Sequence, residues 1–152
     1  MRTSRLRGVD ILEHKAPGYQ PLIWSDGNWM AALMNGTGTS WSIPAQIEQH
    51  PRTDELFVLV AGRAVMVVAG NACKPGKIQQ VAMQRQVLYN VRAGTWHITP
   101  MTKNAKLVII ERKGTNVNGS ILVDLSARQR QAIKISRPVP GRPRMSTIRP
   151  AL

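Results

Sequence analysis

Carboxylate and imidazole side chains gather in one short part of this chain, the segment "IEQHPRTDEL" at residues 47–56. Glu48 and His50 are two positions apart, so on a β-strand they point to the same face. Pro51 interrupts regular strand pairing, and a bulge in the residues that follow would return Glu55 to the face of His50. Because a histidine beside a carboxylate can act as an acid–base pair, this segment is a candidate site for chemistry.

A second histidine follows another turn later in the chain. In "YNVRAGTWH", Gly94 indicates a tight turn three residues before His97. The chain has only 8 acidic residues and 3 histidines. Each of two predicted hairpin corners therefore carries one of these scarce groups at a strand end.

Short apolar segments separated by turn residues must position these side chains. Clusters of Gly, Ser, Asn and Asp recur about every ten residues, which is typical of an all-β sandwich or barrel. The segment "SARQRQAIK" is different, because Ser126 and Gln129 match a capping box and predict a short helix. The predicted strands are 19–24, 29–35, 41–49, 56–61, 64–69, 78–83, 87–91, 106–110 and 120–125.

The spacing of the first acidic cluster follows a known motif. That motif reads His-x-His, three or four residues, Glu, six residues and Gly. In this chain His50, Glu55 and Gly62 match its later positions. Glu48 stands where the motif has its first His, which is the main departure from the pattern.

The second turn follows the partner of that motif, which reads Pro-x-Gly-x-x-His, three residues and Asn. Gly94 and His97 match it, with Arg92 in place of Pro and Met101 in place of Asn. Together the two motifs resemble those of the cupin family, and the resemblance covers roughly residues 28–113.

The resemblance implies an all-β fold, a cupin jelly-roll β-barrel, to which the predicted short C-terminal helix is added. Within the family, the phrases "TDELFVLVAG", "VLYNVRAGTWH" and "VIIERKGT" look like a group of small single-domain cupins of poorly defined function. Fold alone does not define function here, since this architecture hosts many chemistries.

The resemblance also implies a metal site. In metal-bearing cupins the motif residues bind one divalent ion, and the matching positions here are Glu48, His50, Glu55 and His97. Two imidazoles with carboxylates suit iron, manganese, nickel or zinc. Some cupins keep the pocket without the ion, and the histidines and glutamates would then bind each other or an organic ligand.

We therefore expect a metal-binding cupin that acts as an enzyme on a small oxygen-rich molecule, anionic molecules included. Isomerase, lyase, hydrolase and dioxygenase chemistry all stay open. Glu48, Glu55 and Tyr89 are the candidate catalytic residues, with Glu48 as either a fourth ligand or a general base. The alternative from another class is a metal-free cupin that binds or senses a small molecule.

Three further residues are candidates for substrate binding. Trp29 begins a strand that the family pattern places near the barrel mouth, although packing is its simpler role. Arg52 and Arg92 lie beside the two motifs and could attract an anionic substrate, with surface solvation as the alternative. Asp54 is expected to be an exposed turn residue rather than a ligand.

Composition divides the chain into a body and two ends. The formal net charge is +13, and seven basic residues with no acid follow Ser126. A nucleic-acid-binding arm is one interpretation, but the tail lacks aromatic residues for stacking, so a solvated or docked tail is favoured. The expected divisions are an N-terminal arm (1–18), the cupin barrel (19–125), a short helix (126–135) and a basic, proline-rich tail (136–152).

Two continuous apolar segments, 56–61 and 106–110, predict strands that are covered on both faces. A second subunit packed sheet to sheet would provide that cover, and the N-terminal strands are the alternative, so we expect a homodimer. No segment is long and apolar enough to span a bilayer, and the start lacks the apolar region of a secretory signal. With a single cysteine, these features predict a cytoplasmic protein without a membrane partner.

Overall fold

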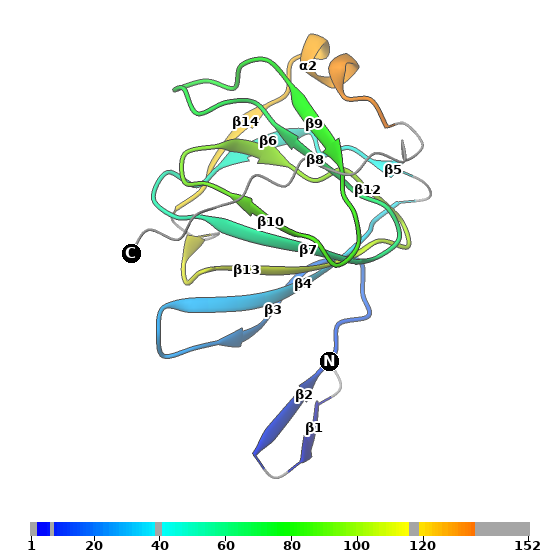
Figure 1. Ribbon diagram of the computed structural model, residues 1–152, viewed down its shortest axis with the longest axis vertical. Helices are drawn as coiled ribbons and strands as arrows, with labels where there is room; N and C mark the ends of the chain where they lie inside the picture. The colour runs from blue at the N-terminus through cyan, green and yellow to red at the C-terminus, as the bar shows by residue number, and fades with distance from the viewer. Residues whose placement is uncertain (1–2, 7, 39–40, 116–118, 136–152) are drawn as a thin grey trace.

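A computed structural model describes residues 3–6, 8–38, 41–115 and 119–135 of the chain. Two five-stranded antiparallel sheets lie face to face, as Figure 1 shows. The first sheet has the order β10 (Leu88–Val91), β7 (Glu55–Ala61), β13 (Lys106–Arg112), β4 (Trp29–Asn35) and β3 (Gly18–Trp24). The second sheet has the order β14 (Ile121–Asp124), β6 (Gln46–Gln49), β11 (Trp96–Ile98), β8 (Val65–Val68) and β9 (Gln79–Ala82).

Two smaller pairs complete the strand inventory of the described residues. β12 (Met101–Thr102) pairs with β5 (Trp41–Ser42), and β1 (Thr3–Leu6) pairs with β2 (Val9–Leu12). The short strands β11 and β12 and the hairpin β1–β2 were not among the strands predicted from the sequence. Each has too few residues to show an alternating pattern of its own.

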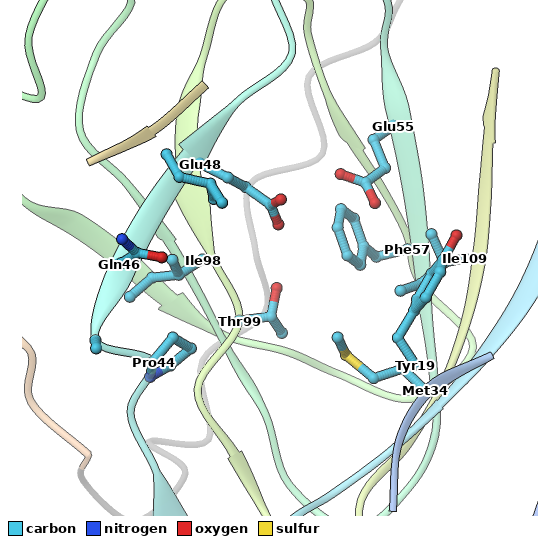
Figure 2. Close-up of a pocket in the computed structure, with 12 residues that line it drawn as sticks. Tyr19, Met34, Pro44, Gln46, Glu48, Glu55, Phe57, Ile98, Thr99 and Ile109 are labelled. Atoms are coloured by element: carbon cyan, nitrogen blue, oxygen red, sulfur yellow. The ribbon is translucent and has the colours of Figure 1, made fainter. Parts of the chain in front are cut away.

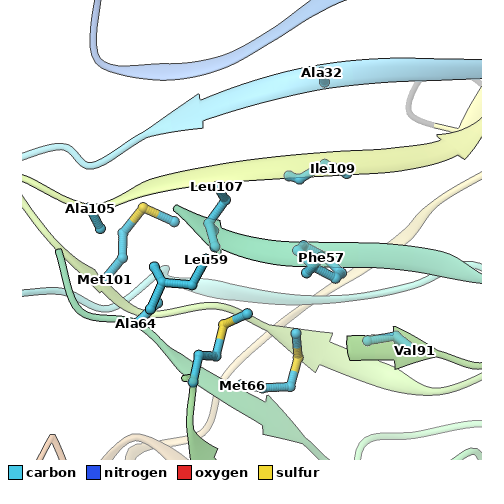
Figure 3. Packing of buried hydrophobic residues seen from close by; sticks show 11 residues of the cluster. Ala32, Phe57, Leu59, Ala64, Met66, Val91, Met101, Ala105, Leu107 and Ile109 are labelled. Carbon is cyan, nitrogen blue, oxygen red and sulfur yellow. The ribbon is translucent and has the colours of Figure 1, made fainter. Parts of the chain in front are cut away.

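The main core lies between the two sheets. On β7, Phe57 and Leu59 are buried, whereas Val60 of opposite parity is 52% exposed. Met66 of β8 joins the same cluster from the second sheet. Figure 3 shows these side chains with Leu107 filling the space between the sheets. Burial of one face of each strand is therefore what holds the sheets together.

A second cluster covers the outer face of the second sheet. Ile47, Val67 and Trp96 point away from the main core and pack with Leu125 and Ile133. The last two residues flank α2 (Ala127–Ala132), the short helix that the sequence predicted. Its N-terminus has the expected capping box, in which Ser126 and Gln129 each bond the backbone of the other. The expected jelly-roll barrel with a short C-terminal helix is thus confirmed.

The outer face of the first sheet is partly exposed to solvent within the part of the chain that the structure describes. Leu88 is 59% exposed there and Trp29 45%, in addition to Val60. β3 and β4 extend this sheet rather than covering it, and the hairpin β1–β2 lies away from it in Figure 1. The homodimer therefore stays a prediction. The tail predicted at 136–152 lies outside the described residues.

No helix among the described residues combines the length and apolar character needed to cross a membrane.

Gly62, the last residue of the first sequence motif, gives a prediction about stability. Its φ is +69°, and a Cβ there would lie 2.4 Å from the backbone Cα of Ala105. Gly70 is a matched control, because its φ is +76° and nothing lies within 4 Å of an added Cβ. Gly70→Ala should cost about 1–2 kcal/mol from the left-handed conformation alone. Gly62→Ala should cost clearly more, because the backbone must also move.

Urea unfolding monitored by tryptophan fluorescence measures both changes in free energy. Equal losses for the two variants would show that the contact between Gly62 and Ala105 does not limit this turn.

Candidate metal centre

The candidate site forms where the chain passes from one sheet to the other. Glu48 is on β6 of the second sheet, and Glu55 begins β7 of the first. The short segment 50–54 connects them, so the two glutamates approach each other across the interior. The chain crosses between the sheets here and does not form the predicted bulge. The crossing nevertheless brings Glu55 close to His50, as the bulge was expected to do. His97 completes the group from β11, where it is directly paired with Glu48.

The four side chains converge on a small volume. His50 Nε2 and His97 Nε2 lie 2.9 Å and 2.8 Å from the same oxygen, Glu55 Oε2. Glu48 is farther away, with its carboxylate oxygens 4.0 Å and 3.9 Å from the two Nε2 atoms. One ligand atom from each of these residues lies within 4.8 Å of all the others. This arrangement offers two nitrogen and two oxygen donors to one ion.

Hydrogen bonds on the far side of each imidazole fix its orientation. His97 Nδ1 lies 2.9 Å from the carbonyl oxygen of Thr95, which can only accept, so Nδ1 carries a proton. His50 Nδ1 lies 3.0 Å from Ser120 Oγ, and that hydroxyl donates its own proton to the carbonyl of Thr115. His50 Nδ1 is therefore also a donor. Both Nε2 atoms consequently face the cluster, as ligating nitrogens do.

The electrostatics reflect this crowding of buried charge. Burial raises the pKa of Glu55, but hydrogen bonds with His50 and His97 outweigh burial and hold the pKa below its usual value. Burial lowers the pKa of His97, and the bond to Glu55 more than reverses this. Burial raises the pKa of Glu48, an effect that the charge of His97 only partly offsets. Of the two glutamates in the cluster, Glu48 therefore takes up a proton more readily than Glu55.

A cavity of about 460 Å³ opens below the cluster, a volume typical of small-molecule sites. Figure 2 shows the carboxylates of Glu48 and Glu55 pointing toward each other at one end, with Met34 at the other. The lining residues are Tyr19, Met34, Pro44, Ala45, Gln46, Glu48, Glu55, Phe57, Ile98, Thr99, Ile109 and Leu122. The cavity therefore combines an acidic end with mostly apolar walls.

No protein-family profile and no curated protein matches the sequence. Among solved structures, the DMSP lyase DddQ from Ruegeria pomeroyi matches with TM-score 0.50 at 14% identity. The alignment covers 68% of this chain and 50% of that enzyme, so the chain spans about half of its length. This chain has the cupin fold.

Two other solved structures are similar at lower TM-scores. A cupin-2 domain protein from Shewanella frigidimarina has TM-score 0.48 and 20% identity, over 65% of this chain and 85% of that one. Oxalate decarboxylase from Bacillus subtilis has TM-score 0.48 and 13% identity, over 63% of this chain and 24% of that one. The match to the DMSP lyase confirms the expected resemblance to cupins at the level of the fold.

The cupin barrel does not bring the other predicted site residues into its cavity. Trp29 has the opposite parity to buried Met30 and lies on the outer face of the first sheet. Arg92 is exposed, and Arg52 lines a separate surface concavity. Tyr89 packs against the main core, and its hydroxyl accepts a hydrogen bond from the backbone of Gln84. None of these four side chains is among the described residues that line the barrel cavity.

Other residues of this site were missed in the sequence. Ser120 is 70 positions from His50, and no local pattern marks it as a partner. Thr99 follows His97 by two residues, so strand alternation could have placed both on one face. Tyr19 lines the cavity from β3 and donates a hydrogen bond to Glu111. Of these three residues, only Thr99 could have been predicted from its spacing to a motif residue.

Asp54 lies outside the cluster and gives a pH prediction. Its exposed carboxylate accepts hydrogen bonds from the Asn90 side chain and the Ala93 backbone, and these hold its pKa below the usual value. Since the folded pKa is lowered, this stabilisation is present above the unfolded pKa and is lost as the pH falls through the folded value. Asp54→Asn should therefore be destabilising at pH 7, by an amount that shrinks below about pH 4.

Urea unfolding of both proteins between pH 3 and pH 7 tests this, with those pH limits chosen around the usual carboxyl pKa of about 4. A difference in unfolding free energy that stays constant over this range would show that ionised Asp54 is not what ties β7 to the β10 turn.

Proposed function

We propose that this cupin binds one divalent metal ion through His50, Glu55 and His97, with Glu48 as fourth ligand or general base. The protein would act as an enzyme on a small oxygen-bearing molecule held in the barrel cavity. The observation that carries this proposal is the convergence of both Nε2 atoms on one carboxylate oxygen.

The donor arrangement fits a cation better than it fits the side chains alone. With Nδ1 protonated, a neutral imidazole would direct the bare lone pair of Nε2 at the negative oxygen of Glu55. Either a second proton or a cation must lie between these atoms. A divalent ion satisfies both histidines and both glutamates at once, and their two negative charges balance it.

The residues divide into holding and reacting groups. Ser120 and Thr95 hold the two imidazoles, and Glu55 is held between them. Glu48 is different, because its side chain is 34% exposed and faces the cavity that would contain the substrate. Its raised pKa suits a carboxyl that takes a proton from a bound molecule and returns it. A bound divalent ion would supply Lewis acidity toward a substrate oxygen.

One observation favours a second candidate function, a metal-free cupin that binds or senses a small molecule. The hydrogen bonds from His50 and His97 to Glu55 satisfy the buried carboxylate when both imidazoles are fully protonated. The cavity would then serve binding alone.

Metal titration separates the two candidates. Purified protein freed of metal should bind about one equivalent of zinc or manganese in calorimetry, with a matching rise in melting temperature. Ser120→Ala should weaken this affinity roughly 10- to 100-fold, because it releases the orientation of His50. His97→Ala should weaken it further, because it removes a ligand. His14→Ala, which changes the histidine outside the cluster, should leave the affinity unchanged.

Absence of stoichiometric binding for zinc, manganese, iron and nickel would contradict the metal proposal and favour the second candidate. Glu48→Gln assigns the role of that residue. A loss of affinity identifies a ligand, and an unchanged affinity leaves Glu48 as the proton acceptor.

We further propose that the open face of the first sheet forms the homodimer. The apolar side chains of Val60 and Leu88 are more than half exposed on this face, and Ile23, which pairs with outward-facing Ala31, is 43% exposed. Val60→Lys should shift sedimentation from dimer to monomer, because a charge would be buried between the sheets. Val9→Lys is the control, since Val9 is equally exposed on the separate hairpin. An unchanged mass for Val60→Lys would contradict this interface.

A further inference from the structure

The polar groups of the cavity wall indicate the charge of the molecule that it accepts. We propose that the ligand is an uncharged molecule with hydroxyl groups and an apolar face, and that Tyr19 and Thr99 select it. This inference rests on the proposed role of the cavity as the ligand site, and it departs from the anionic substrate that the sequence allowed.

The first observation is the sign of charge along the wall. Glu48 and Glu55 line the cavity, and no lysine or arginine is among the lining residues that the structure describes. Arg52 and Arg92, which could have attracted an anion, lie elsewhere on the surface. A carboxylate in the apolar part of this cavity would therefore be unpaired, which is costly.

The second observation is the direction of the Tyr19 hydrogen bond. Tyr19 lines the cavity, and its hydroxyl proton is donated to the buried carboxylate of Glu111. A phenol oxygen whose proton is donated in this way can act toward a ligand only as an acceptor. A ligand hydroxyl can donate to such an oxygen, whereas a carboxylate can only accept. Tyr19 and Glu111 together thus favour a ligand that carries a donor.

The third observation is a polar group that lacks a partner. Thr99 lines the cavity, and its buried hydroxyl oxygen has no hydrogen-bond partner among the described residues. Figure 2 shows this hydroxyl directed toward the space below Glu48. Buried polar groups in folded proteins are nearly always paired, and exceptions often belong to functional sites. A hydroxylated ligand would supply the missing partner.

The remaining walls define the apolar face of the ligand. Met34, Phe57 and Ile109 of the first sheet line one side of the cavity. They offer no hydrogen bonds, so the ligand must be apolar where it meets them. The proposed molecule is therefore a hydroxylated compound with a compact hydrocarbon or aromatic body.

A matched pair of probes tests the charge preference. 3-Hydroxybenzyl alcohol and 3-hydroxybenzoate have nearly the same size and differ in charge. Ligand-detected NMR titration, with chelator present and no metal added, should show the alcohol binding about tenfold or more tightly than the benzoate. Tyr19→Phe should weaken binding of the alcohol about three- to tenfold, the usual effect of one hydrogen bond. Tyr89→Phe is the matched control, since it removes a hydroxyl outside the cavity.

Thr99→Val supplies a readout that a merely structural role would not give. Removing an unpartnered buried hydroxyl should raise the melting temperature of the ligand-free protein by about 2–4 °C and weaken binding of the alcohol. A lowered melting temperature would show that the hydroxyl is structural.

Three results would overturn the proposal. These are equal or tighter binding of the benzoate, equal losses for Tyr19→Phe and Tyr89→Phe, and no binding of either probe. None of them depends on metal, so a failure here is distinguishable from a failure of the metal titration.

Discussion

The buried carboxylate of Glu55 is the constraint on which the rest of the site depends. A charge in the interior requires partners. Glu55 has two of them, the imidazoles of His50, which follows β6, and His97, which lies on β11. The crossing from β6 to β7 brings His50 to Glu55, and the pairing of β11 with β6 brings His97 to the same oxygen. The strands that form the barrel wall therefore also carry Glu48, Glu55 and His97 of the site.

Much of the fold followed from the sequence because local signals agreed with each other. Turn residues between short apolar segments gave most strands of both sheets, and Ser126 with Gln129 gave the helix. The grouping of Glu48, His50, Glu55 and His97 also followed, because the resemblance of the two motifs to those of cupins implied which side chains meet. The path that joins them did not. Spacing cannot distinguish a bulge within one sheet from a crossing between two.

The parts of the site that could not be predicted come from distant segments. Ser120 reaches His50 only because β14 pairs with β6, and that pairing has no signature in either segment. Tyr19 enters the cavity from β3, at the edge of the other sheet. Conversely, Arg52 and Arg92 were chosen for being near the motifs in sequence. A neighbouring position on a turn can face outward, so proximity along the chain was a poor guide to proximity in the cavity.

The bond between Ser120 and His50 makes the site depend on the last part of the barrel. His50 acquires its fixed orientation only after the last strand of the barrel has joined the sheet. β14 is the last strand along the chain among the described residues. Loss of the segment that carries Ser120 would therefore leave His50 without the hydroxyl that orients it, although all four residues of the cluster would still be present.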